Sequence, residues 1–127
     1  MFKLVLIFLG AGLGGVARYA LGGAVQGVSG ESFPAGTLAV NVAGCLVIGF
    51  LDAAFAGPVL VREEHRIAIF VGIIGGFTTF SSFGKETLSL AVDGEYLLAG
   101  LNVMLSNVLG LGAVWLGLRL GERAYGV

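Results

Sequence analysis

The chain reads Gly75-Gly76-Phe77-Thr78-Thr79-Phe80-Ser81-Ser82-Phe83 in the middle of an apolar run that is long enough to cross a bilayer. Paired glycines and β-branched threonines both weaken a helix, so we expect a break at Gly75-Gly76. A break at membrane depth frees backbone carbonyls that hydrocarbon cannot hydrogen-bond. It persists only where protein, an ion or water satisfies those groups. The stretch therefore predicts a polar site inside the membrane.

The composition indicates an integral membrane protein. The 127 residues are 57% hydrophobic and 12% charged, with a mean hydropathy of +0.98, whereas soluble domains carry about twice that charged fraction. The length leaves room for a single domain, residues 1–127. A net charge of −1 offers no basic patch, which argues against nucleic acid as a partner. One cysteine and one histidine give neither a side-chain metal cluster nor a Ser-His-Asp set, so we predict that the protein is not an enzyme.

Four apolar runs have the length of about 20 residues that a membrane-spanning helix needs. The runs cover Leu4–Val25, Thr37–Ala56, Ile67–Val92 and Tyr96–Leu118. The connections between them are Gln26–Gly36, Gly57–Arg66 and Asp93–Glu95. The pattern predicts an all-α membrane protein with four transmembrane helices, the third of which is broken in mid-membrane.

Glycine pairs spaced by four residues predict close helix packing. Such a spacing puts a smooth stripe on one helix face and lets backbones approach each other. The pairs are Gly10 with Gly14, Gly72 with Gly76, and Gly117 with Gly121. Because four helices enclose little interior, a solute pathway is expected to need a second copy of the chain.

The distribution of Lys and Arg predicts the orientation in the membrane. With four spans both termini share a side, which also holds Lys3, Arg62, Arg66, Arg119 and Arg123, whereas Arg18 and Lys85 fall toward the other side. Five against two favours both termini in the cytoplasm.

Polar side chains within the first two runs allow two interpretations each. Arg18 falls late in the first run, where it either snorkels to the headgroups or attracts anions at a vestibule. Asn41 lies about one turn into the second run, with Thr37 four residues earlier on the same face. Its amide either joins two helices or donates hydrogen bonds to a solute.

The third and fourth runs carry further polar pairs at helical spacing. Asn102 and Ser106 are four residues apart and share a face, whereas Asn107 lies about 100° away and is assigned to helix packing. Ser82 and Glu86 are also four apart. Glu86 forms either an ion pair near the membrane surface or a buried carboxylate beside a solute path.

Phe80 and Phe83 follow the expected break at a spacing of three residues. An aromatic pair at this spacing is often core packing. Ring edges carry the positive part of the aromatic quadrupole, however, and can favour an anion in a dry pore. The hydroxyls of the neighbouring Thr79, Ser81 and Ser82 strengthen the second interpretation.

Three segments together resemble the CrcB/Fluc family of fluoride channels. They are Gly14-Gly15-Val16-Ala17-Arg18-Tyr19, Gly36-Thr37-Leu38-Ala39-Val40-Asn41-Val42-Ala43-Gly44, and Gly75 through Phe83 followed by Glu86. The resemblance covers essentially the whole chain. The third motif, Gly-Gly-x-Thr-Thr-Phe-Ser-Ser-Phe, is the most specific.

The resemblance implies a dual-topology homodimer, in which two antiparallel copies form two fluoride pores in a prokaryotic cell membrane. It implies a structural, untransported Na⁺ at the dimer centre, held by the backbone carbonyls of Gly75 and Thr78 from each subunit. Oxygen ligands from a broken helix suit such a hard cation. Phe80, Phe83 and Asn41 match the pore residues of the family, and Ser106 lies on its polar track of the fourth helix.

The predicted function is passive export of fluoride, which lowers its toxicity. The pore residues are Thr37, Asn41, Phe80, Ser82, Phe83, Glu86, Asn102 and Ser106, with Arg18 at the vestibule. The unequal Lys and Arg count leaves room for a related partner chain of opposite topology. One alternative is a small proton-coupled multidrug exporter, although such exporters use an acid in the first helix, where this chain has Arg18. Another is a structural membrane subunit, which would explain the glycines but not the polar pattern.

Overall fold

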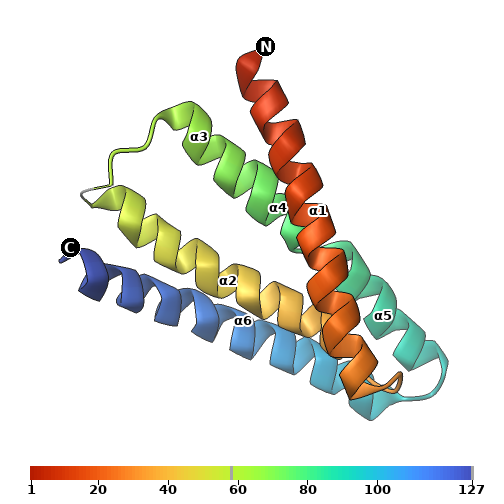
Figure 1. The fold of residues 1–127 in the computed structure, drawn as a ribbon. Coiled ribbons are helices and arrows are strands. Elements are labelled where there is room, and N and C mark those ends of the chain that lie inside the picture. The colour runs from red at the N-terminus through yellow and green to blue at the C-terminus, as the bar shows by residue number, and fades with distance from the viewer. Residues whose placement is uncertain (58, 127) are drawn as a thin grey trace.

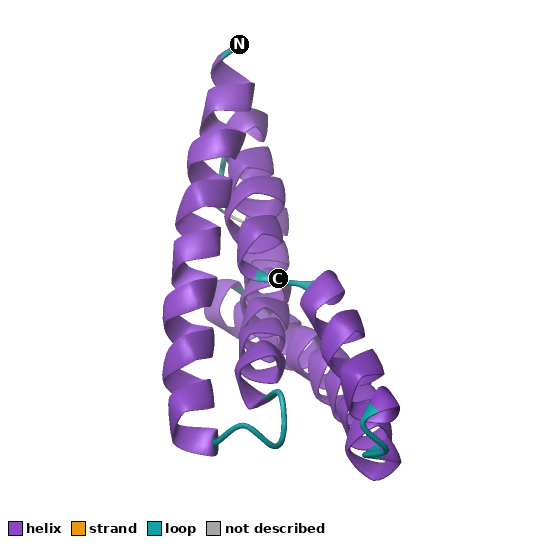
Figure 2. Cartoon of the chain, turned by 90° about the vertical axis from the view of Figure 1, so that its right-hand side faces the viewer, coloured by secondary structure: helices purple, strands orange, loops and turns teal. Residues whose placement is uncertain are grey.

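The computed structural model describes residues 1–57 and 59–126, which form helices joined by short loops (Figures 1 and 2). In chain order these are α1 (Phe2–Ser29), α2 (Ala35–Ala56), α3 (Glu63–Ile67), the π-helix η1 (Ala68–Ile74), α4 (Gly75–Phe77), α5 (Phe80–Val92) and α6 (Tyr96–Tyr125). Within this part of the chain, four helical stretches are long and apolar enough to cross a membrane: α1, α2, α6 and the succession α3 to α5 over Glu63–Val92. The four predicted spans are confirmed, with ends that differ by up to seven residues, the largest difference being at the end of α6.

The third span is interrupted, but at Thr78-Thr79 and not at Gly75-Gly76 as the sequence led us to expect. Thr78 (φ −82°, ψ 157°) and Thr79 (φ −150°, ψ 110°) are extended, whereas both glycines belong to α4. A Cβ on Gly76 would lie 2.6 Å from the carbonyl oxygen of Ala11. This glycine therefore serves the approach of α4 to α1, while the β-branched threonines take the extended backbone that suits their side chains.

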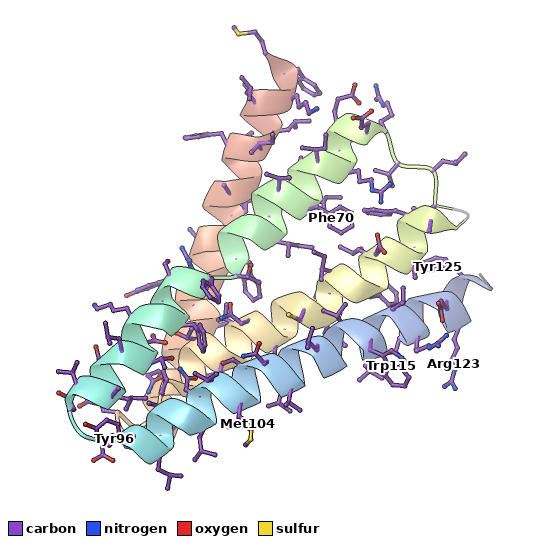
Figure 3. The ribbon with its side chains drawn as sticks, turned by 180° about the vertical axis from the view of Figure 1, so that it is seen from behind. Phe70, Tyr96, Met104, Trp115, Arg123 and Tyr125 are labelled. Carbon is purple, nitrogen blue, oxygen red and sulfur yellow. The ribbon has the colours of Figure 1, made fainter. Side chains whose placement is uncertain are left out.

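Helices α2 and α6 lie side by side along most of their length (Figures 1 and 3). Gly49 packs against the backbone at Val114, and Gly117 packs against the backbone at Leu46, too closely for any Cβ. Because neither helix carries a side chain at these crossings, the two backbones come into direct contact. The broken third span packs against this pair of helices.

Helix α1 crosses the broken helix on its other side (Figure 1). A Cβ on Gly10 would lie 2.8 Å from the carbonyl oxygen of Ala68, and one on Gly72 would lie 3.0 Å from that of Ile7. All six glycines of the three predicted pairs sit where a Cβ would crowd a neighbouring helix backbone. The predicted packing role of these pairs is confirmed.

Much of the outer apolar surface is left uncovered by the chain itself. Met104 and Trp115 point away from α2 on the outer face of α6 (Figure 3), with exposed fractions of 53% and 60%. The buried hydrophobic residues, by contrast, are mostly small, such as Ala53 and Ala54. Apolar faces of this extent suit contact with lipid or with another protein surface.

Candidate functional site

The Asn41 side chain of α2 holds the break in the third span. Its Nδ2 donates to the Thr79 carbonyl at 3.0 Å, and the Thr79 N–H donates to its Oδ1 at 2.8 Å. The amide thus supplies both bonds that the helix ladder does not make at Thr79, as a break at membrane depth requires. Because a primary amide carries two N–H groups, one of them remains for another acceptor.

Thr79 was named from the sequence only as a hydroxyl beside the two phenylalanines and not as a residue of the site. It is buried, with 8% of its surface exposed. Its Oγ1 accepts from the Ser82 N–H at 3.2 Å and donates to Ser82 Oγ at 3.0 Å, which caps the start of α5. Thr is one of the residues favoured at a helix N-cap, and this preference is the signal in the sequence that could have pointed to Thr79. The break is therefore ordered on both sides, by Asn41 and by this cap.

A cavity of about 300 Å³, here called the inner cavity, lies beside the break. It brings together Asn41, Phe80, Phe83 and Ser106 from three predicted segments, and its full lining is Asn41, Gly44, Cys45, Ile48, Ile74, Thr78, Thr79, Phe80, Phe83, Ser106 and Asn107. The rings of Phe80 and Phe83 are 5.4 Å apart between centroids and tilted by 46°. Phe80 is 82% exposed in the single chain.

The inner cavity contains donors that have no partner among the residues that the structure describes. Asn41 has one free amide N–H, and Asn107, whose Nδ2 donates to the Val103 carbonyl at 2.7 Å, has another. No hydrogen bond within residues 1–57 and 59–126 uses the Ser106 hydroxyl. These N–H and O–H groups, together with the two rings, can surround a small hydrogen-bond acceptor, such as an anion.

A second cavity of about 410 Å³, here called the Arg18 cavity, lies on the other side of Thr79, which lines both. Half-buried Arg18 lines it together with Thr37, Ser82 and Glu86. The Thr37 hydroxyl donates to Glu86 Oε1 at 2.7 Å, whereas Glu86 Oε2 is buried without a partner in the described part of the chain. The Glu86 carboxylate thus lines the Arg18 cavity, and it forms no ion pair among the described residues.

The two asparagines of α6 take positions that differ from those expected. Asn102 is almost fully buried, with 1% exposed, and its Nδ2 donates to Thr87 Oγ1 at 2.9 Å. It ties α6 to α5 and lines neither cavity. Asn107, which the spacing assigned to helix packing, lines the inner cavity beside Ser106. The cavity therefore covers a wider arc of α6 than the stripe that Asn102 and Ser106 share.

The backbone at the break offers oxygen ligands. In a continuous helix the Gly75 carbonyl would accept from the Thr79 N–H, and the Thr78 carbonyl would accept from the Ser82 N–H. These N–H groups donate instead to Asn41 Oδ1 and to Thr79 Oγ1. The two carbonyls are therefore released from the helix ladder, and the described residues hold no group of three or more His, Cys, Asp or Glu side chains that could bind a metal.

Comparison with known proteins places the chain in a family. The family model described as "CrcB-like protein, Camphor Resistance (CrcB)" matches residues 5–118. The chain belongs to the CrcB family. Together with the four apolar helices, this membership identifies a multi-pass prokaryotic membrane protein.

Several bacterial members of the CrcB family carry the name fluoride-specific ion channel FluC. The one from Opitutus terrae is 51% identical over 119 residues, which cover 92% of this chain and 90% of the relative. The one from Geobacter sulfurreducens is 43% identical over 123 residues, covering 97% and 99%. The one from Methylococcus capsulatus is 43% identical over 121 residues, and the chain spans only 53% of that relative's length.

Proposed function

We propose that the chain forms a fluoride-selective channel that exports fluoride passively from the cytoplasm and so lowers its toxicity. One observation carries the proposal. Asn41, Ser106 and Asn107 keep hydrogen-bond donors without a partner in the described part of the chain, and they line a cavity together with Phe80 and Phe83. The names of the bacterial relatives point to the same ion.

Fluoride is small, strongly hydrated and accepts hydrogen bonds without donating them. A selective path must replace its water with donors, and amides, hydroxyls and ring edges do so without fixing a counter-charge. Chloride is larger and gains less from each donor. Because fluoride enters cells as a neutral weak acid and ionises inside, a passive path down its gradient suffices for export.

The proposed assembly is an antiparallel, dual-topology homodimer. Phe80 is 82% exposed and the inner cavity opens at the surface of one chain, so a second copy would close it and exclude lipid. The uncovered faces of Met104 and Trp115 leave ample apolar surface for such contact or for lipid (Figure 3). Two copies related by an axis through the break would form two equivalent pathways.

A structural Na⁺ would hold the two subunits together at that axis. The released carbonyls of Gly75 and Thr78, one pair from each subunit, offer four neutral oxygens, which suits a monovalent hard cation. Gly75 is exposed in the single chain, so its backbone is accessible to a partner. The ion supplies a fixed positive charge between the subunits and takes no part in transport.

Fluoride efflux from liposomes that contain the purified protein tests the function. The liposomes are loaded with potassium fluoride, and a membrane potential is imposed with a potassium ionophore in the absence of a pH gradient. Fluoride release that follows the potential, with little chloride release from matched vesicles, supports a selective channel. Strict dependence on a proton gradient would instead indicate a coupled exporter, and no release of fluoride under either condition would indicate a structural subunit.

A further inference from the structure

We infer that Gln26 is a positioning residue for the proposed fluoride pathway: it fixes the first turn of α2 so that the Thr37 hydroxyl stays on Glu86. The inference rests on the proposed function and names a residue outside its motifs. Gln26 is half-buried near the end of α1, and no pore, vestibule or metal role was assigned to it from the sequence.

The Gln26 side chain uses both of its polar atoms to close the loop between α1 and α2. Its Nε2 donates to the carbonyls of Gly30 and Phe33, the latter at 2.9 Å, and its Oε1 accepts from the Gly36 N–H at 3.0 Å. These bonds tie Gly30 and Phe33 of the loop, and Gly36 in the first turn of α2, to the end of α1.

The bond to Gly36 replaces a missing helix cap. The N-cap residue of α2 is Pro34, which makes no side-chain cap hydrogen bond. The first N–H groups of a helix have no partner within the helix, so one of them depends on Gln26. Gly36 also packs against the backbone of Gly22 in α1, too closely for a Cβ. Gln26 therefore fixes the start of α2 where its backbone comes close to that of α1.

Thr37 follows Gly36 directly, and its hydroxyl donates to Glu86 Oε1 at 2.7 Å. Glu86 Oε2 is buried without a partner in the described part of the chain, so this hydroxyl is the one protein donor seen on the carboxylate. If the first turn of α2 rotates, the carboxylate loses that donor. A carboxylate left without a donor in the path of an anion repels it and is itself costly to bury.

The position of Gln26 matches this role. Gln26, Ser82 and Glu86 line the Arg18 cavity and also an adjoining cavity of about 500 Å³ that includes Lys85. Gln26 thus lines both of the cavities that Glu86 lines.

The test is a double-mutant cycle on fluoride efflux with Gln26→Leu, Thr37→Val and the double variant. The Leu side chain is of similar size and removes all three hydrogen bonds. We expect each single variant to slow efflux by roughly three- to tenfold, the effect of one such bond. If Gln26 acts through Thr37, the double variant is about as slow as the slower single variant, since the two changes remove the same interaction.

Ser29→Ala is the matched control. Ser29 lies on the same last turn of α1, is exposed, and donates to the Val25 carbonyl of its own helix at 2.9 Å, so its loss should leave efflux unchanged. If Gln26→Leu yields no folded protein, the same cycle is run with Gln26→Met, which also removes all three hydrogen bonds but keeps an unbranched side chain of similar length.

Two results would overturn the inference. One is Gln26→Leu efflux equal to that of the wild type, and the other is a double variant in which the two effects multiply. Both leave the wild-type protein as an active fluoride channel, whereas wild-type liposomes that release no fluoride would refute the proposed function itself.

Discussion

Replacing Asn41 with Asp exchanges one amide NH₂ for a carboxylate oxygen at the centre of the break. The Asn41 Nδ2 lies 3.0 Å from the Thr79 carbonyl oxygen, so the variant sets two oxygens against each other and leaves that carbonyl without a donor. The Thr79 N–H keeps its acceptor, which was bonded at 2.8 Å. The break therefore retains one of its two ties, and we expect the protein to fold.

The substitution has two effects, one on stability and one on transport. An unpaired carbonyl in this position destabilises the fold by about 1–3 kcal/mol. A fixed negative charge costs a fluoride ion that passes about 5 Å away roughly 3 kcal/mol, at an effective dielectric constant of about 20. The second effect predicts that efflux slows by roughly a hundredfold.

Efflux from liposomes is measured for Asn41→Asp beside Asn107→Asp. Asn107 lines the same inner cavity but is exposed, and its amide is bonded to its own helix at Val103. The control adds the same charge without touching the break, so it should slow efflux less. An Asn41→Asp protein that elutes as the wild type does and releases fluoride at the wild-type rate would refute the role of Asn41.

Three further outcomes are expected. Phe80→Ile keeps an apolar side chain but removes the ring edge, so efflux should fall while protein yield and thermal stability stay near wild type, because Phe80 is 82% exposed in the single chain; undiminished efflux would make the ring a packing element. Gly76→Ala puts a methyl group 2.6 Å from a carbonyl oxygen of α1 and should lower stability by about 1–3 kcal/mol, whereas Gly12→Ala, with nothing within 4 Å, should not lower stability in the same thermal unfolding assay. If Na⁺ binds the backbone at the axis, Thr78→Ser should be mild and Gly75→Val should abolish the difference in thermal stability between sodium and a large organic cation; a difference of wild-type size in the Gly75 variant would contradict that site.

The spans and their packing could be predicted because hydropathy and glycine spacing are local properties of the sequence. Gly10 and Gly72 show their role through spacing alone, since a backbone contact needs only the absence of a side chain. The predicted break in the third span exists, but it lies at Thr78-Thr79, later in the chain than the predicted Gly75-Gly76. Its position depends on Asn41, whose bonds to Thr79 join residues 38 positions apart and leave no local pattern.

The sequence predicted which residues belong to the candidate site better than it predicted which of them are in contact. Thr37 and Glu86 were each recognised as polar groups within a span, but their hydrogen bond links residues 49 positions apart. Asn102 and Ser106 share a nominal helix face, yet only Ser106 lines the inner cavity. Spacing fixes which residues lie near one another on a helix, whereas the rotation of that helix is set by its neighbours, here through contacts such as that between Asn102 and Thr87.

Gly75 shows why the proposed dimer can be tested by substitutions in a single chain. A Cβ at Gly75 would meet only the Phe70 carbonyl oxygen, at an ordinary 3.6 Å, and the residue is exposed. Within one subunit the position therefore has room for a side chain, unlike Gly76, whose Cβ would clash with α1. A severe effect of Gly75→Ala would therefore not come from a clash of its methyl group inside the chain, and it would report a surface or an ion that a second subunit brings to the break.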